Sequence, residues 1–159
     1  MKALVAGVGD VLLSDDGFGV EVARRLAGEP LPGGVQVIDF GPHAGRLAAH
    51  LLHGCEFLIL IDTVERGGDP GTLYVIEADG SHAGRHAAVD GAEKSLNAAV
   101  AMFQTLGGDI ARVVVVGCEP AEVGAGVGLT APVARAVDEA VSIVRQLLVE
   151  TLETPGQTS

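Results

Sequence analysis

The most informative stretch of this chain is Gly7-Val8-Gly9-Asp10-Val11-Leu12-Leu13-Ser14-Asp15-Asp16-Gly17-Phe18-Gly19-Val20. The apolar run Ala3 to Ala6 precedes it and predicts a first β-strand. After it, a helical spacing places Phe18, Val22 and Leu26 on one face. The stretch therefore predicts a glycine-rich turn that joins a strand to a helix.

The turn carries Asp10, Asp15 and Asp16 and no basic residue. Phosphate binds at a helix N-terminus through backbone N–H groups and the positive end of the helix dipole, and carboxylates compete with it. We therefore expect the loop to bind a cation or a polar substrate.

Composition indicates one soluble α/β domain. The chain has 159 residues, of which 48% are apolar and only 3% aromatic, so Val, Leu, Ile and Ala must build the core. Such a core suits a parallel sheet covered by helices. The net charge of −11 opposes nonspecific binding to nucleic acid or to anionic membranes, and it suits a cationic or metal-bearing partner.

Cys55 and Cys118 lie far apart and follow no metal-ligand spacing, so we expect two free thiols in a reducing compartment. The sequence shows neither a signal peptide nor an apolar run of about 20 residues, the length of a membrane span. We expect a cytoplasmic protein.

Five segments have the pattern of β-strands: Lys2–Ala6, Val35–Asp39, Phe57–Asp62, Thr72–Glu77 and Arg112–Gly117. Their alternation with amphipathic stretches predicts a doubly wound domain, a mostly parallel five-stranded twisted sheet with helices on both faces. Only a short glycine-rich turn precedes Thr72–Glu77, which should be an antiparallel edge strand.

Three later helices are expected from residues at helical spacing. Their apolar positions are Leu47, Leu51 and Leu52; Leu96, Val100, Phe103 and Leu106; and Val133, Val137, Ala140, Val141, Val144 and Leu148, with Thr130 as N-cap of the last helix. Gly54 should end the first of them in a left-handed conformation. We expect a mobile surface loop over 78–91, an α/β domain over 1–149 and a disordered tail over 150–159.

Polar residues gather where parallel strands end. In open α/β sheets the functional crevice lies beyond the carboxyl ends of these strands. We expect Asp16 and Asp62 to be the leading pair at this edge, with Asp39 and His43 behind them. Two carboxylates and an imidazole are suitable ligands for nickel or zinc. Also at this edge are Asp10, Asp15, Gly41 and Glu119.

Each carboxylate also has a structural interpretation. Asp15 or Asp16 could cap the first helix, Asp62 could mark the exit of a strand from the core, and Asp39 could accept hydrogen bonds from loop N–H groups. Three carboxylates that converge on one edge favour a functional site.

The chain resembles the hydrogenase maturation endopeptidases, which trim the C-terminal extension of a [NiFe]-hydrogenase large subunit. The similarity spans roughly Lys2 to Leu148. It rests on the first loop and on these shorter passages in order: Asp39-Phe40-Gly41, Leu60-Ile61-Asp62, Gly71-Thr72-Leu73, Val116-Gly117-Cys118-Glu119-Pro120 and Gly128-Leu129-Thr130-Ala131-Pro132.

This resemblance implies that Asp16 and Asp62 are the catalytic, metal-binding acids and that Asp39-Phe40-Gly41 recognises the substrate. It also implies that the metal is nickel already inserted in the large-subunit precursor, with no organic cofactor. The two acids would coordinate the nickel and so position the scissile peptide. A nearby carboxylate or a metal-polarised water would then attack this peptide. Family usage places such an enzyme among the aspartic-type endopeptidases.

The chain departs from the family at the third ligand, a histidine that opens the third helix. Spacing puts Lys94 or Ala92 there, and a protonated lysine cannot ligate a metal. His86 is the favoured substitute, because its loop leads into that helix; His43 and His82 are alternatives. The remaining alternatives are a site that works with two carboxylates alone and a member with impaired activity.

Two other functions stay open from the sequence. Gly7-Val8-Gly9 followed by Asp39 imitates a dinucleotide fingerprint, although Leu12 stands in place of its third glycine. The missing histidine also allows a non-catalytic chaperone that recognises nickel-loaded hydrogenase.

Overall fold

The computed structural model describes residues 2–78, 110 and 112–152. Its elements, in chain order, are β1 (Ala3–Val8), the 3-10 turn η1 (Ser14–Gly17), α1 (Phe18–Ala27), β2 (Val35–Gly41), α2 (Ala44–Leu51), β3 (Phe57–Thr63), β4 (Leu73–Ala78), β5 (Arg112–Cys118) and α4 (Ala131–Leu152).

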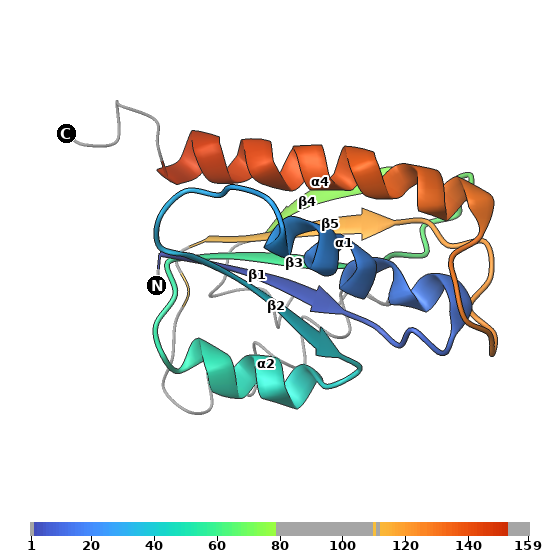
Figure 1. Cartoon of the computed structure of the whole chain (residues 1–159), viewed down its shortest axis with the longest axis horizontal. Coiled ribbons are helices and arrows are strands. Elements are labelled where there is room, and N and C mark those ends of the chain that lie inside the picture. The colour runs from blue at the N-terminus through green and yellow to red at the C-terminus, as the bar shows by residue number, and fades with distance from the viewer. Residues whose placement is uncertain (1, 79–109, 111, 153–159) are drawn as a thin grey trace.

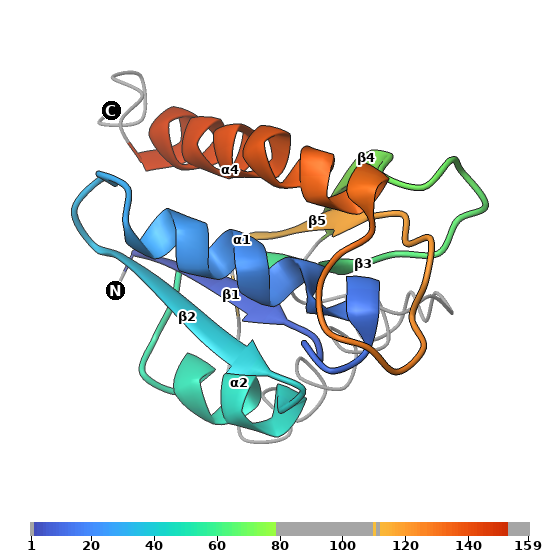
Figure 2. The ribbon, with the colours of Figure 1, turned by 45° about the vertical axis from the view of Figure 1, so that its right-hand side comes forward.

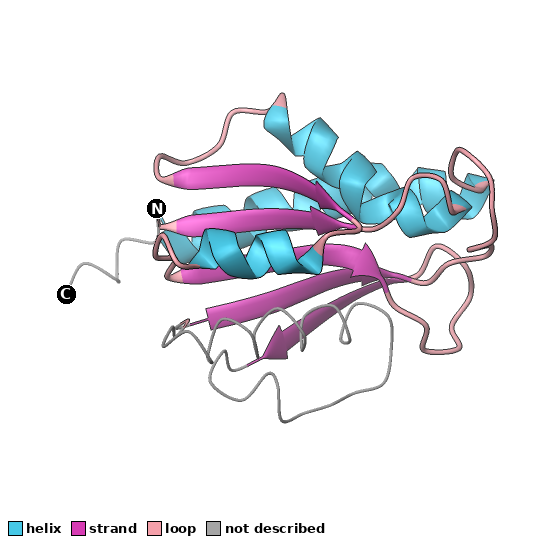
Figure 3. Cartoon of the chain, turned by 90° about the horizontal axis from the view of Figure 1, so that it is seen from below, coloured by secondary structure: helices cyan, strands magenta, loops and turns pink. Residues whose placement is uncertain are grey.

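The five strands form one sheet in the order β2-β1-β3-β5-β4 (Figure 3). β1 pairs in parallel with β2 and β3, and β3 pairs in parallel with β5. β4 is the antiparallel edge strand, because the connection from β3 is too short for a crossover. These pairings confirm the predicted fold.

Helices cover both faces of the sheet, with α1 and α4 on one face and α2 on the other (Figures 1 and 2). The strand side chains alternate between two cores. Leu4, Leu58 and Val113 belong to the core that contains Leu47 of α2, whereas Val5, Ile59 and Val114 belong to the core that contains Phe18 of α1. The strands are therefore apolar on both faces, as the composition predicts.

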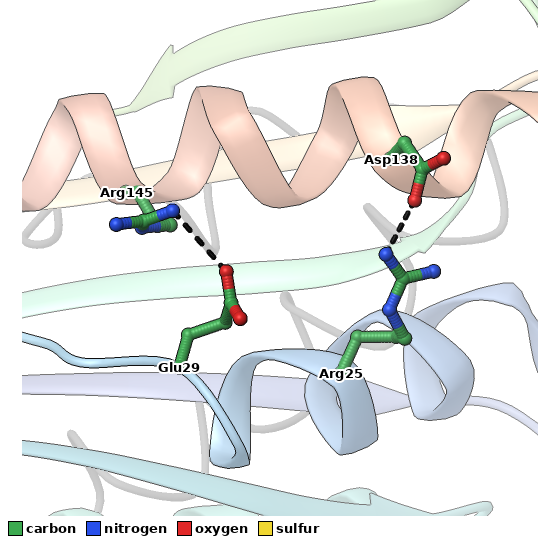
Figure 4. Close-up of polar contacts among 4 residues, drawn as sticks. All are labelled: Arg25, Glu29, Asp138 and Arg145. Atoms are coloured by element: carbon green, nitrogen blue, oxygen red, sulfur yellow. Dashed lines mark hydrogen bonds and ion pairs between the residues drawn. The ribbon is translucent and has the colours of Figure 1, made fainter.

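Ion pairs join α1 and its C-terminal loop to α4 across the protein surface (Figure 4). Arg25 pairs with Asp138, and Arg145 Nη1 lies 3.1 Å from Glu29 Oε1. Exposed pairs contribute little to stability. The buried apolar faces of α1 and α4 hold the helices on the sheet, and α1 in turn holds the loop that precedes it.

Two expectations need correction. The parallel strands end one or two residues later than predicted, so Asp39 and Asp62 lie inside β2 and β3; Asp62 still pairs with Gly117 of β5. Leu52 does not share the buried face of Leu47 and Leu51, because it follows the last turn of α2 and is 50% exposed.

The apolar positions predicted for the other described helices and the conformation of Gly54 are confirmed. Gly54 has φ +92°, and every apolar position predicted for the last helix is buried in α4. α4 runs to Leu152, three residues into the expected tail. Residues 79–91 of the expected loop and the predicted helix around Val100 lie outside the described residues. No helix in the described part of the chain is long and apolar enough to cross a membrane.

Candidate functional site

The glycines of the first loop allow close packing of α1 on the sheet. A methyl group on Gly7 would lie 2.3 Å from the carbonyl oxygen of Gly19, and one on Gly19 would lie 2.1 Å from the carbonyl oxygen of Ile61. Both contacts are within the protein itself. In a dinucleotide fingerprint the second glycine makes room for the pyrophosphate, whereas a methyl group on Gly9 would meet the carbonyl oxygen of Asp16 at 1.9 Å.

Asp16 lies half-buried in η1, at the carboxyl end of β1. Its Oδ2 accepts a hydrogen bond of 2.8 Å from the main-chain N–H of Asp10. Its carbonyl oxygen packs against Gly9, where a methyl group would lie 1.9 Å from it. Gly9 has φ +141°, a conformation that favours glycine. The loop thus folds back on itself around Gly9.

Asp62 also lies beside Gly9, where a side chain at this position would project. A methyl group on Gly9 would be 3.6 Å from Asp62 Oδ1, and this oxygen accepts a hydrogen bond of 2.7 Å from the N–H of Thr63. Through the Gly9–Asp10 backbone, these contacts limit the separation of the Asp16 and Asp62 carboxylates to about 10 Å. The structure therefore brings the predicted leading pair to the point where the strand order reverses, between β1 and β3.

The turn at the end of β2 borders the same loop. Asp39 Oδ1 accepts a hydrogen bond of 2.8 Å from the N–H of Gly41, and Oδ2 lies 3.6 Å from Arg24 Nε. A cavity of about 330 Å³ separates this turn from the first loop; Gly9, Asp39 and Gly41 are among its lining residues. Phe40 is 3% exposed and packs in the core on the α2 side.

In the described part of the chain, no histidine joins Asp16 and Asp62 in a group of three possible ligands. His43 is exposed at the start of α2. Within residues 2–78, 110 and 112–152, no three His, Cys, Asp or Glu side chains form a group that could hold a metal ion. His82, His86, Ala92 and Lys94 lie outside the described residues.

Asp15 has a structural role that the capping interpretation only partly anticipates. Its fully buried carboxylate accepts hydrogen bonds from the N–H groups of Ala121, Glu122 and Thr130 and from the Thr130 hydroxyl. Burial acts to raise the pKa of the Asp15 carboxyl, but the hydrogen bonds outweigh burial and hold this pKa below its ordinary value. Asp15 thus joins η1 to the segment before α4, which lies beside the first loop (Figure 2).

Glu119 is a second buried carboxylate at this edge, and it holds the β3–β4 connection. Its Oε1 accepts hydrogen bonds from the N–H groups of Arg66 and Gly68, at 2.9 and 3.1 Å, and from the Tyr74 hydroxyl at 2.7 Å. Burial acts to raise the pKa of Glu119, but these bonds lower it below its ordinary value. Glu119 therefore stabilises the connection between β3 and β4.

Cys118 is also buried at this edge, but its pKa shifts in the opposite direction. Burial raises the pKa of its thiol to about 12, with Asp15 and Glu119 adding to the shift. Burial also raises the pKa of the half-buried Cys55. Both cysteines are free, as predicted. Neither has the lowered pKa that marks a reactive thiolate.

Sequence reasoning missed the partners of these buried carboxylates. Thr130 lies 115 residues from Asp15, and Tyr74 lies 45 residues from Glu119. The predicted list of residues at the carboxyl edge contained both acids, but no pattern in the sequence indicates which donors each one meets.

The model of the hydrogenase maturation protease family matches residues 20–147. The chain is 34% identical to the hydrogenase expression/formation protein HupD of Rhodobacter capsulatus, over 99% of this chain and 77% of the relative. The hydrogenase maturating endopeptidase HybD from E. coli has a similar structure, with a TM-score of 0.79 and 25% identity over 96% of this chain and 94% of the other. For the hydrogenase 2 maturation peptidase from a Thaumarchaeota archaeon, the TM-score is 0.72 and the identity 30%, over 93% and 98%. The chain therefore belongs to the hydrogenase maturation protease family.

Proposed function

We propose that this protein is the endopeptidase that removes the C-terminal extension of a nickel-loaded [NiFe]-hydrogenase large-subunit precursor. The observation that carries the proposal is that Asp16 and Asp62 both lie beside Gly9, at the switch point of the sheet. Ligand sites in open α/β sheets lie at such points.

In this proposal Asp16 and Asp62 bind the nickel of the precursor, and His86 completes the ligand set. Carboxylate and imidazole suit nickel, whose selectivity depends on ligand type and geometry. The bound metal places the neighbouring peptide beside the carboxylates, which supplies the orientation that hydrolysis needs. The cavity next to Asp39 and Gly41 offers room for the adjoining chain of the precursor.

The aspartic-type assignment is part of the proposal. It is supported by the two cysteines, which are unsuited to act as a thiolate nucleophile. Burial raises the pKa of Cys118 to about 12, and it also raises the pKa of Cys55. The net charge of −11 suits a cationic metal centre as partner and opposes nucleic acid or an anionic membrane. We propose a cytoplasmic location, where the precursor would be loaded.

A non-catalytic chaperone is the second candidate. Lys94 or Ala92 occupies the place of the family histidine, and the described residues contain no complete group of three metal ligands. A chaperone would bind the nickel-loaded precursor and leave its mass unchanged.

Purified protein, incubated with nickel-loaded and with nickel-free precursor, separates the candidates by mass spectrometry. We expect the large subunit to lose its C-terminal peptide only in the nickel-loaded sample. Stable binding with no change in mass would support the chaperone. A thermal shift with NAD or ATP would support the nucleotide-binding alternative.

A further inference from the structure

The 121–128 segment is held to the protein by the loop that carries Asp16. Every residue of this segment is exposed. The hydrogen bonds recorded between it and the rest of the described chain end on Leu12, Ser14 and Asp15. Leu12 and Ser14 bond with the main chain of Gly126 at 2.9 and 2.8 Å.

Asp15 is the buried centre of this attachment. Its main-chain N–H donates to the carbonyl oxygen of Glu122 at 2.9 Å, while its carboxylate accepts from Ala121 and Glu122. The same carboxylate accepts from Thr130 at the start of α4, with 2.7 Å between Thr130 N and Oδ1. Asp15 is thus fixed from both its backbone and its side chain.

The next residue in η1 is Asp16, and close contacts fix its position. Its carbonyl oxygen packs on Gly9, and its carboxylate accepts from Asp10. On the other side of Asp15, Ser14 has φ +54°, which a residue with a side chain rarely adopts. Such a conformation persists only where surrounding contacts hold it. The bonds of Ser14 to Gly126 and Gly124, together with those of Asp15, provide these contacts.

We propose that Asp15 is a positioning residue, which sets the direction of the Asp16 carboxylate by binding η1 to the segment 121–130. This inference rests on the proposed function, because it gives Asp16 a precise task. Loss of the Asp15 bonds would let η1 rotate and move the Asp16 carboxylate. A misplacement of about 1 Å in a catalytic site can lower the rate about 100-fold.

Asp15→Asn tests the proposal, and Glu119→Gln is its matched control. Both acids are buried and accept several hydrogen bonds at the same end of the sheet, but Glu119 holds the 64–72 connection and not η1. The assay measures kcat and KM for nickel-loaded precursor well below the melting temperature of each variant. We expect Asp15→Asn to lower kcat about tenfold or more and Glu119→Gln to keep it within about twofold.

Equal losses of kcat in these two variants would overturn the proposal, since both would then act through stability. If Asp15→Asn does not fold, Thr130→Val and Thr130→Ser decide the matter: the serine keeps the hydroxyl donor and should keep kcat, whereas the valine should lower it. Equal kcat in the two Thr130 variants would also overturn it. Asp16→Asn is measured in the same assay. Normal processing by Asp16→Asn would overturn the proposed function of Asp16. If Asp16→Asn loses processing while Asp15→Asn and the Thr130 variants process normally, only the positioning role of Asp15 is overturned.

Discussion

The carbonyl oxygen of Asp16 packs so closely on Gly9 that a methyl group there would lie 1.9 Å from it. The same methyl group would lie 3.6 Å from Asp62 Oδ1. The Asp16 backbone and the Asp62 carboxylate therefore both border the space that a side chain at Gly9 would fill, and the lack of that side chain lets the loop close.

Gly9→Ala should destabilise the fold by about 2–4 kcal/mol, through overpacking and a strained φ, and should abolish processing. Gly45→Ala is the control, because no atom lies within 4 Å of its new methyl group and alanine favours the helix α2. Urea unfolding and the processing assay measure both effects. A Gly9→Ala protein with unchanged stability would contradict the packing described for this loop.

Asp16→Asn and Asp62→Asn should each abolish processing, because a neutral amide is a poor ligand for nickel. Neither change should unfold the protein, since asparagine has nearly the same shape and can still accept the bonds from Asp10 and Thr63. Asp138→Asn, which removes a surface ion pair with Arg25, should process normally. Wild-type rates in both site variants would rule out these acids as the catalytic pair.

His86→Ala should lower the processing rate by at least about tenfold if His86 supplies the third ligand, since loss of a ligand weakens the grip on the metal. His43→Ala should leave the rate nearly unchanged, because His43 forms no group of three with other described ligands. His82→Ala completes the set. Mass spectrometry of the precursor over time gives the three rates, and a loss confined to His43→Ala would reassign the ligand.

Acid should destabilise the protein through Asp15 and Glu119. Hydrogen bonds hold both folded-state pKa values below the ordinary values of 3.8 and 4.5. Their contribution to the free energy of unfolding is therefore full above these ordinary values and is lost as the pH falls through the folded-state pKa values. We expect a nearly constant melting temperature down to roughly pH 5 and a steep fall below pH 4. The fall should be shallower in Asp15→Asn and Glu119→Gln; an equally steep fall would assign it to other groups.

Much of the fold could be predicted because its signals are local. Apolar runs such as Phe57–Asp62 predict buried strands, and the spacing of Val133, Val137 and Val144 predicts the buried face of α4. The short connection before β4 predicts its antiparallel direction. Leu52 was misplaced because the helix ends before it, and a spacing rule holds only while the helix continues.

Local patterns in the sequence predict the order of strands and helices along the chain, the apolar faces that pack them, and the presence of Asp16 and Asp62 at one edge of the sheet. Which acids are structural is evident only in the folded protein, because Asp15 and Glu119 meet their donors across long stretches of chain. Hydrogen bonds between distant residues depend on how the elements pack. Two neighbouring aspartates that look alike in sequence thus have different surroundings: Asp15 is buried and bonded to the 121–130 segment, while Asp16 is half-buried beside Gly9.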